Sequence, residues 1–139
     1  MKRTARDIMT KKVVTASEDM VLTDVMRLLL RWRISGLPVV NADGDLLGII
    51  TEHDLVNFIV SGNAPRTRVS EVMTAEVNTY TPDTLFIDIV NDFVANRIRR
   101  VPIVESGKVV GILSRRDIIR EMERTYNRVV GKADTENEA

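Results

Sequence analysis

The chain repeats itself at a spacing of 64 residues, and this internal repeat limits its possible folds more than any single motif. Met9 corresponds to Met73 and, after a deletion of one residue, Asp54 corresponds to Asp117. A unit of roughly 60 residues buries little apolar surface alone, so we expect the two copies to pack against each other. Two grooves between the copies would result, and each groove is a candidate ligand site.

The composition narrows the class of protein. Of the 139 residues, 44% are hydrophobic and 29% are charged, which is typical of a soluble globular protein. No apolar run approaches the roughly 18 residues that a membrane helix needs, and the charged first residues predict no signal peptide. The chain has no cysteine and one histidine, His53, which excludes disulfides, thiolate catalysis and a histidine-rich metal site. We therefore expect a cytoplasmic protein without a metal site.

Charge is distributed unevenly along the chain. The formal net charge is zero, so no overall field attracts nucleic acid, and nucleic-acid binding is not expected. Residues 97–128, however, hold nine Lys and Arg against four Asp and Glu, a local net charge of +5. A basic patch of this size in the second repeat suits a small anion better than a long polyanion.

Each copy shows the same order of predicted elements, β-α-β-β-α. After a short start, at 5–10 or 69–74, come a β-prone stretch and a helix with apolar residues at helical spacing. Two short apolar runs joined by a glycine-bearing turn then predict a β-hairpin. The predicted strands are 13–15, 37–40 and 46–50 in the first copy and 77–79, 101–104 and 109–113 in the second. The predicted helix starts are Ser17 and Thr51 in the first copy and Thr81 and Ser114 in the second.

These patterns predict an α/β (α+β) fold and its boundaries. The first repeat covers 5–60, a linker rich in turn-forming residues covers 61–68, and the second repeat covers 69–126. Residues 127–139 are polar and unpatterned, which predicts a frayed tail.

The strongest local pattern is a glycine, two apolar residues, a hydroxyl and, three positions later, an aspartate. It runs from Gly48 to Asp54 and again from Gly111 to Asp117. One interpretation is a capping box, in which hydroxyl and acid bond backbone N–H groups at a helix start. The other is a ligand site, in which the helix start faces phosphate, the aspartate binds both ribose hydroxyls, and the glycine allows close approach.

A second pattern distinguishes the two copies. Arg99 and Arg100 end a predicted helix just before a strand, whereas their counterparts are Ser35 and Gly36. A solvated basic face is one interpretation, and a phosphate contact through the planar guanidinium groups is the other. If they bind phosphate, the second groove should prefer the more anionic ligand.

Other features carry weaker signals. Pro38 and Pro102 come early in their strands, where proline is tolerated at an edge with backbone groups free for a base. His53 is a surface residue or, when protonated, a phosphate contact like its counterpart Arg116. The amphipathic segment 118–124, together with Leu55, Phe58 and Ile59, is a candidate interface between chains.

The motifs and their order resemble a tandem pair of cystathionine-β-synthase (CBS) domains. The resemblance rests on 7–10, 35–40 and 48–55 and their copies, and it covers about 5–125. It implies two β-α-β-β-α repeats related by pseudo-two-fold symmetry, with two clefts. Such pairs commonly bind AMP, ADP, ATP or S-adenosylmethionine, dimerise into flat discs and regulate an enzyme, channel or transporter.

The resemblance also implies roles for individual residues. Asp54 and Asp117 would bind ribose, Arg99 and Arg100 would meet phosphate as a basic pair does in the γ subunit of AMP-activated kinase, and Ser35 and Gly36 break this basic pattern in the first repeat. The candidate ligand-binding residues are Val14, Thr15, Leu37, Pro38, Thr51, His53, Asp54, Asn78, Thr79, Arg99, Arg100, Val101, Pro102, Ser114, Arg115, Arg116 and Asp117.

The function predicted at this point is a stand-alone regulatory CBS pair, not an enzyme, because no catalytic constellation and no Walker loop is present. No cofactor is required, although a polyphosphate ligand would bring Mg²⁺. A homodimer and a separate effector protein, of unknown identity, are expected. The alternative is a ligand-independent dimerisation scaffold.

Overall fold

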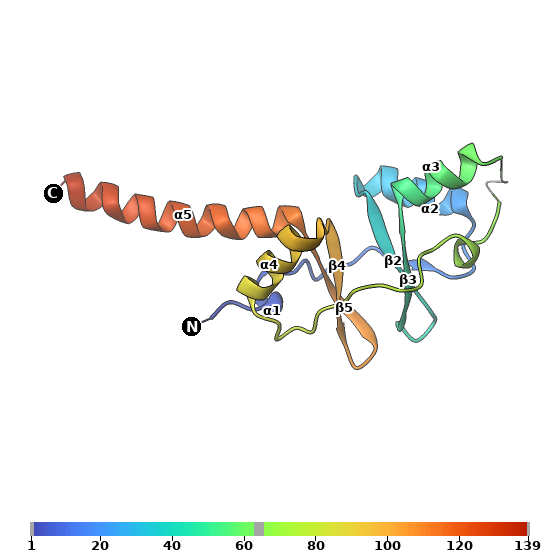
Figure 1. The fold of residues 1–139 in the computed structure, drawn as a ribbon, viewed down its shortest axis with the longest axis horizontal. Coiled ribbons are helices and arrows are strands. Elements are labelled where there is room, and N and C mark those ends of the chain that lie inside the picture. The colour runs from blue at the N-terminus through green and yellow to red at the C-terminus, as the bar shows by residue number, and fades with distance from the viewer. Residues whose placement is uncertain (1, 63–65, 139) are drawn as a thin grey trace.

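The computed structural model describes residues 2–62 and 66–138, and part of the predicted linker lies outside these ranges. The first repeat contains α1 (Ala5–Ile8), β1 (Ala16–Ser17), α2 (Leu22–Trp32), β2 (Gly36–Val40), β3 (Leu46–Thr51) and α3 (Glu52–Val60). The second contains the 3-10 helix η1 (Val69–Glu71), α4 (Phe86–Asn96), β4 (Arg100–Glu105), β5 (Lys108–Ser114) and α5 (Arg115–Glu138). Figure 1 shows the two repeats side by side, with α5 extending beyond them to the C-terminus.

Both predicted hairpins are confirmed. Strands β2 and β3 pair antiparallel with Gly36 opposite Thr51, and β4 and β5 pair antiparallel with Arg100 opposite Ser114. Both hairpins carry an irregularity at the same place, after Val39 in one and after Ile103 in the other. The two predicted second helices also begin where expected, because α3 and α5 follow Thr51 and Ser114 directly.

The predicted starts of the first helices were wrong. The residues after Ser17 form a turn, in which Met20 N donates to Ser17 O. Helix α2 begins only at Leu22, and its N-cap residue is Val21, whose N donates to Asp24 Oδ2. In the second repeat Thr81 and Thr84 close a similar turn before α4. Turn formers and capping residues are largely the same amino acids, so the sequence signal was ambiguous.

The predicted first strands were also wrong in position. β1 lies at Ala16–Ser17 and pairs in parallel with β2, rather than at 13–15. Within the described residues, 77–79 form no strand, and only Tyr80 bridges to Ile103 of β4. In each repeat, the described segment before the first long helix pairs only where it runs beside the first strand of the hairpin, β2 or β4.

The start of each repeat packs on the other repeat. Thr10 bridges to Ile112 of β5, and its counterpart Thr74 bridges to Ile49 of β3. Further reciprocal hydrogen bonds run from Ala5 N to Thr84 O and from Val69 N to Met20 O, both 2.8 Å long. Because each contact recurs between the counterpart residues, the two repeats are related by a pseudo-two-fold axis.

Because the start of each repeat is exchanged onto the other repeat, each hydrophobic core contains residues from both repeats. Val69 of η1 is fully buried with first-repeat residues such as Leu22 and Ile50, whereas Ala5 and Ile8 of α1 are buried with second-repeat residues. Helix α1 and η1 thus each complete the core of the opposite repeat, so neither repeat has a complete core of its own.

Glycines in β3 and β5 make room for the exchanged segments. A methyl group at Gly48 would lie 2.7 Å from Thr74 O and 2.9 Å from Met73 Sδ, and one at Gly111 would lie 2.9 Å from Met9 Cγ and closer still to its Sδ. The sequence interpretation assigned this close approach to a ligand. In the structure the exchanged start of the other repeat occupies that space.

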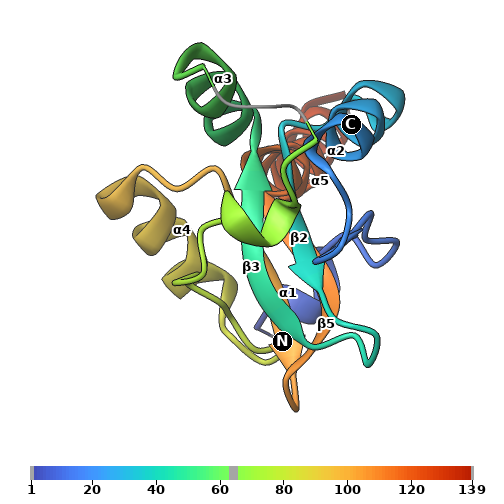
Figure 2. The same cartoon turned by 90° about the vertical axis from the view of Figure 1, so that its right-hand side faces the viewer.

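The hairpin tips meet at the axis. Asp45 Oδ1 and Lys108 Nζ, which are counterparts in the repeat, form an ion pair of 2.8 Å. Leu46 N donates to Gly107 O, and Val109 N donates reciprocally to Gly44 O. Figure 2, viewed along the molecule, shows the hairpins one behind the other with the helices around them.

Helix α5 is anchored to the N-terminal segment by a buried carboxylate. Glu121 is 6% exposed and accepts hydrogen bonds from Arg3 Nε, at 2.8 Å, and from Arg124 Nη2, at 2.9 Å. These bonds lower its pKa to about 2. The helix continues through Glu138, so the separate tail predicted at 127–139 is not seen over 127–138, a stretch with no proline to end the helix. Residue 139 lies outside the described residues.

Gly111→Ala is expected to lower the free energy of unfolding by about 1–3 kcal/mol, because the added methyl overlaps Met9. Urea denaturation measures the loss. Met9→Ala in the same chain should relieve most of the overlap, so the double variant should lose less than the sum of the two single losses. Strictly additive losses would contradict the packing of Met9 on Gly111.

Glu121→Gln is expected to cost about 2 kcal/mol near neutral pH, because two arginines lose a charged acceptor. The pKa of Glu121 is depressed from 4.5 to about 2, so its carboxylate stabilises the fold above pH 4.5, and this contribution is lost as the pH falls toward about 2. Urea denaturation of both proteins across this window should show their difference shrinking with acid. A difference independent of pH would contradict this assignment.

Candidate functional site

The first turn of interest joins β3 to α3. Asp54 Oδ2 accepts hydrogen bonds from Thr51 N at 2.9 Å and from Thr51 Oγ1 at 3.0 Å, while Asp54 N donates to Thr51 Oγ1 at 3.2 Å. This is a complete capping box. Among the described residues, no donor reaches Asp54 Oδ1, so one oxygen of this half-buried carboxylate remains available.

The second turn joins β5 to α5 and is more fully bonded. Asp117 Oδ2 accepts from Ser114 N at 2.8 Å and from Ser114 Oγ at 3.1 Å. Its Oδ1 accepts from Thr10 Oγ1 at 3.0 Å and from Arg120 Nη1 at 2.9 Å. Asp117 is 4% exposed. The capping interpretation therefore holds at both turns, but the two aspartates differ in their second oxygen.

Arg100 crosses from the second repeat to the first. A methyl group at Gly36 would lie 2.6 Å from Arg100 Nη1 and 3.0 Å from its Cζ, so the guanidinium lies directly on Gly36. Burial, together with the neighbouring charge of Arg99, lowers the pKa of Arg100, and the carboxylate of Glu52 opposes this. Within the described part of the chain, no side chain or carbonyl accepts a hydrogen bond from this guanidinium.

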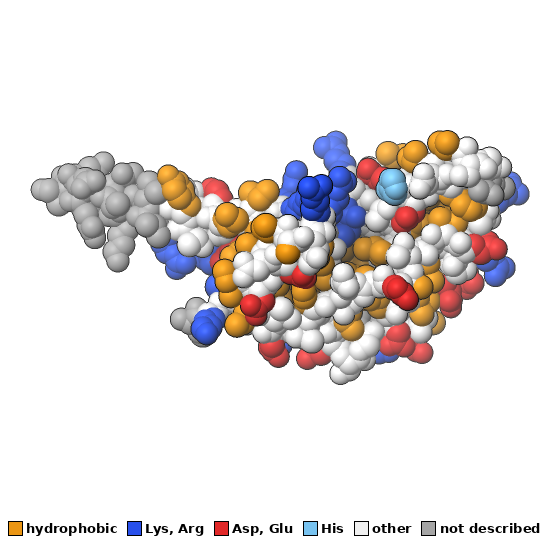
Figure 3. Space-filling view, in the orientation of Figure 1, with side chains coloured by type: hydrophobic (Ala, Val, Ile, Leu, Met, Phe, Trp, Pro, Cys, Tyr) orange, Lys and Arg blue, Asp and Glu red, His pale blue; other side chains and the backbone are white. Residues whose placement is uncertain are grey.

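The other basic residues of the patch are exposed. Figure 3 shows Lys and Arg side chains gathered over the end of α4 and the start of α5, facing the first repeat. Arg99 and Arg116 are exposed there, as is His53 on α3. Arg115 is held by structural bonds, since its Nε donates to Ile98 O at 2.8 Å and its Nη2 to Arg97 O at 3.3 Å, at the end of α4.

Eight other candidate ligand-binding residues divide by burial. Leu37, Pro38, Val101 and Pro102 have buried side chains, which leaves only their backbone for a ligand. Pro102 O already accepts from Tyr80 N at 3.2 Å, and β2 pairs with both β1 and β3, so the predicted free edges are partly used. Val14 and Thr15 are half-buried, while Asn78 and Thr79 are exposed.

The family follows from the repeated units themselves. The family model for the CBS domain matches residues 5–61 and again residues 69–124. The chain belongs to the CBS domain family. An uncharacterized protein of Methanocaldococcus jannaschii, MJ1426, is 34% identical to this CBS pair over 84% of the chain and 89% of its own length. Two other relatives from that organism are longer, and the chain covers 41% and 44% of them.

Solved structures share the fold over most of this CBS pair. The CBS domain pair of MJ0100, in complex with 5′-methylthioadenosine and S-adenosyl-L-methionine, aligns with a TM-score of 0.80 at 27% identity, over 90% of this chain and 99% of that one. CBSX2 in complex with AMP aligns with a TM-score of 0.81 at 24% identity, over 88% and 98%. The second likeness concerns the fold alone.

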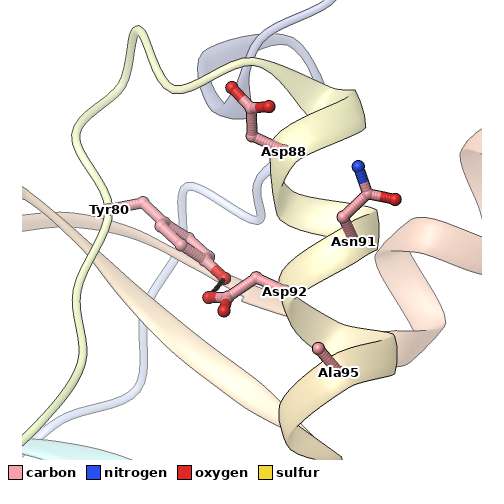
Figure 4. Close-up of a pocket in the computed structure, with 5 residues that line it drawn as sticks. All are labelled: Tyr80, Asp88, Asn91, Asp92 and Ala95. Atoms are coloured by element: carbon pink, nitrogen blue, oxygen red, sulfur yellow. Dashed lines mark hydrogen bonds between the residues drawn. The ribbon is translucent and has the colours of Figure 1, made fainter.

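Two shallow cavities lie away from the contact between the hairpins of the CBS pair. One, of about 480 Å³, lies against α4, where Figure 4 shows Tyr80 pointing to Asp92. The Tyr80 hydroxyl donates to Asp92 Oδ2 at 2.5 Å, and burial with this hydrogen bond raises the pKa of Tyr80. The other, of about 390 Å³, lies between α3 and η1 and is lined in part by Asp54. The second cavity is lined by residues of both copies, as expected of a groove between them, whereas the first is lined by the second copy alone.

Among the described residues, no group of three or more His, Cys, Asp or Glu side chains is placed to hold a metal ion. None of the helices over the described ranges is both long and apolar enough to span a bilayer.

Sequence reasoning missed two contributors to these sites. Thr10 bonds Asp117 from 107 positions away, and Gly36 provides the space for Arg100. Gly36 is the counterpart of Arg100 in the repeat, so the alignment of the two copies contained a signal for this pair. That signal can be interpreted only once the structure shows that the Arg100 side chain crosses to the other repeat.

Asp117→Asn is expected to lower the free energy of unfolding by about 2–3 kcal/mol, and Asp54→Asn by about 1 kcal/mol. The reason is that Asp117 accepts bonds at both oxygens, including one from Thr10 across the repeats, whereas among the described donors only those of Thr51 reach Asp54. Thermal or urea denaturation without ligand compares the two directly. Equal losses would contradict the difference between the caps.

Proposed function

We propose that this CBS pair is a regulatory module that binds an adenosine-containing ligand between its repeats: AMP, ADP, ATP or S-adenosylmethionine. The observation that carries the proposal is the match, over nearly the whole chain, to the MJ0100 CBS pair, whose structure holds two adenosyl compounds. We do not assign a catalytic role to any residue.

The roles of the residues follow from their chemistry. A carboxylate at a strand-to-helix turn can accept hydrogen bonds from ribose hydroxyls, which is the role proposed for Asp54 or Asp117. Phosphate oxygens suit a guanidinium for which the described residues provide no hydrogen-bond acceptor, which is the role proposed for Arg100 and, at the exposed edge, Arg99. His53, when protonated, and Arg116 lie near the helix starts, and the role proposed for them is a further cationic contact to phosphate. A polyphosphate ligand would bring its own Mg²⁺.

Regulation requires that the ligand favour one arrangement of the protein over another. A ligand that contacts both repeats couples its binding free energy to their relative position, and hence to the surface seen by an effector protein. A second copy of the chain and an unidentified effector are the partners expected.

One observation favours the alternative, a scaffold that dimerises without ligand. On α5 the side chains of Ile119, Met122 and Tyr126 are 64%, 55% and 66% exposed at helical spacing, and on α3 Val56 and Val60 are also exposed. Apolar helix faces of this kind are typical of protein contacts. A homodimer is compatible with both functions, so ligand binding must distinguish them.

Millimolar AMP, ADP, ATP or S-adenosylmethionine should raise the thermal unfolding midpoint if one of them is the ligand. At about 100 times its dissociation constant a ligand of the folded state adds about 2.7 kcal/mol, which shifts the midpoint by several degrees. For a phosphate-bearing ligand the shift should shrink in Arg100→Ala and persist in Arg27→Ala, whose side chain is 78% exposed on α2.

The absence of a shift with all four compounds would contradict the proposal and favour the scaffold. A shift that is equal for all four, and unchanged in Arg100→Ala, would indicate non-specific binding and contradict it equally.

A further inference from the structure

Helix α5 continues past the two repeats. It is 24 residues long, and the match to the CBS domain ends at residue 124, so the last part of the helix lies beyond the family unit. Within 115–128, Glu121 is the last buried residue, and every residue from 122 to 128 is exposed. Figure 1 shows the helix extending away from both repeats. The helix therefore leaves the body of the molecule near Glu121.

The sequence of this outer part is a poor helix former. Residues 129–138 include Gly131, which weakens a helix interior, and the β-branched Val129, Val130 and Thr135. Most helical stability in proteins comes from packing of an apolar face, and short helices without such packing are marginal in water. A helix that continues through these residues therefore needs a surface to pack on.

An apolar seam runs along one side of α5. Ile119, Met122 and Tyr126 are exposed at spacings of three and four residues. In the sequence the same alternation continues to Val129 and Ala133. Apolar residues in this alternation are the pattern by which two helices pack along each other. We call these five positions the α5 seam.

The α5 seam lies on the side of the helix away from the N-terminal segment. Asp117 and Glu121 are the buried polar residues of α5, and they accept hydrogen bonds from Thr10 and Arg3. A helix turns once in about 3.6 residues, so Ile119, which is two positions from each of them, lies on the opposite side. The seam is therefore directed away from the contacts that anchor α5.

The charges along α5 match those of a second copy running in the opposite direction. Residues 115–128 hold five Arg against three Asp and Glu, a net charge of +2, whereas residues 129–138 hold one Lys against three Asp and Glu, a net charge of −2. In an antiparallel pair, the basic half of each helix lies beside the acidic half of the other. A parallel pair would place like charges together, which is unfavourable.

We propose that the α5 seam is a dimer interface, at which α5 packs antiparallel on α5 of a second copy of the chain and crosses it near Tyr126. The pairing supplies the packing that the outer part of the helix needs. It also places the two CBS pairs at opposite ends of one helix pair. No ligand takes part in it, so the inference is independent of the proposed function.

Sedimentation velocity of the full chain over a range of concentrations tests the interface. Wild type should dimerise, and Tyr126→Asp should raise the dissociation constant of the dimer by about 10- to 100-fold, because an aromatic side chain leaves the centre and a charge replaces it. Asn127→Asp adds the same charge on another side of the helix and should dimerise as wild type does. A monomeric wild type, or equal weakening by the two changes, would overturn the inference.

Cross-linking tests the direction of the helices, and the absence of cysteine from the chain leaves no background reaction. In an antiparallel pair that crosses near Tyr126, position 119 lies close to position 133 of the other chain, whereas the two copies of position 119 lie about 20 Å apart. A bismaleimide linker of about 10 Å should therefore join Ile119→Cys to Ala133→Cys in a mixture and should not join Ile119→Cys to itself. The reverse result would overturn the antiparallel arrangement.

Hydrogen exchange tests whether the pairing supports the helix. At a concentration where wild type is dimeric, the backbone amides of 127–138 should exchange at least about 10-fold more slowly in wild type than in Tyr126→Asp. Equal exchange in the two proteins would overturn the supporting role of the α5 seam. A chain that dimerises in this way but binds none of the four adenosine compounds would contradict the proposed function alone, and a chain that binds one of them but stays monomeric would contradict this inference alone.

Discussion

At the pseudo-two-fold axis, residues of one repeat lie against their counterparts in the other repeat, and these contacts constrain the rest of the structure. On such an axis a residue meets its equivalent, so two identical repeats would place like charges or two large side chains together. Here the axis joins Asp45 to Lys108 and Gly36 to Arg100. Covalent duplication allows the two positions of each pair to differ, so that one becomes an ion pair and the other a side chain lying on a glycine.

The same axis makes the two repeats depend on each other for their cores. Val69 completes the first core and Ala5 completes the second, while Met9 and Met73 cover glycines in the strands of the opposite repeat. An ion pair that is about half exposed, such as Asp45 with Lys108, adds little, at most about 1 kcal/mol. The exchanged apolar segments therefore contribute most of the free energy that holds the two repeats together. The residues at the axis determine the relative orientation of the repeats.

Local patterns predicted local structure well. The hairpins and the starts of α3 and α5 were predicted correctly because alternation, a glycine-bearing turn and a hydroxyl-aspartate box lie within a few residues of each other. The starts of α2 and α4 were not, because Ser17 and Thr81 close turns with the same chemistry that caps helices. The exchange of Ala5 and Val69 could not be predicted, since an apolar residue carries the same pattern whichever repeat it packs on.

The unequal aspartates show why function at such a site depends on distant residues. Asp54 and Asp117 have the same local sequence pattern and the same cap, and they differ because Thr10 and Arg120 reach one of them and no described donor reaches the other's Oδ1. The guanidinium of Arg100 likewise lies on the first repeat, because its counterpart there is Gly36. A ligand held between Asp54 and Arg100 would contact both repeats at their axis, where a small change in their relative position alters both contacts. Such a site reports the arrangement of the pair as a whole, which is the property that a regulatory module requires.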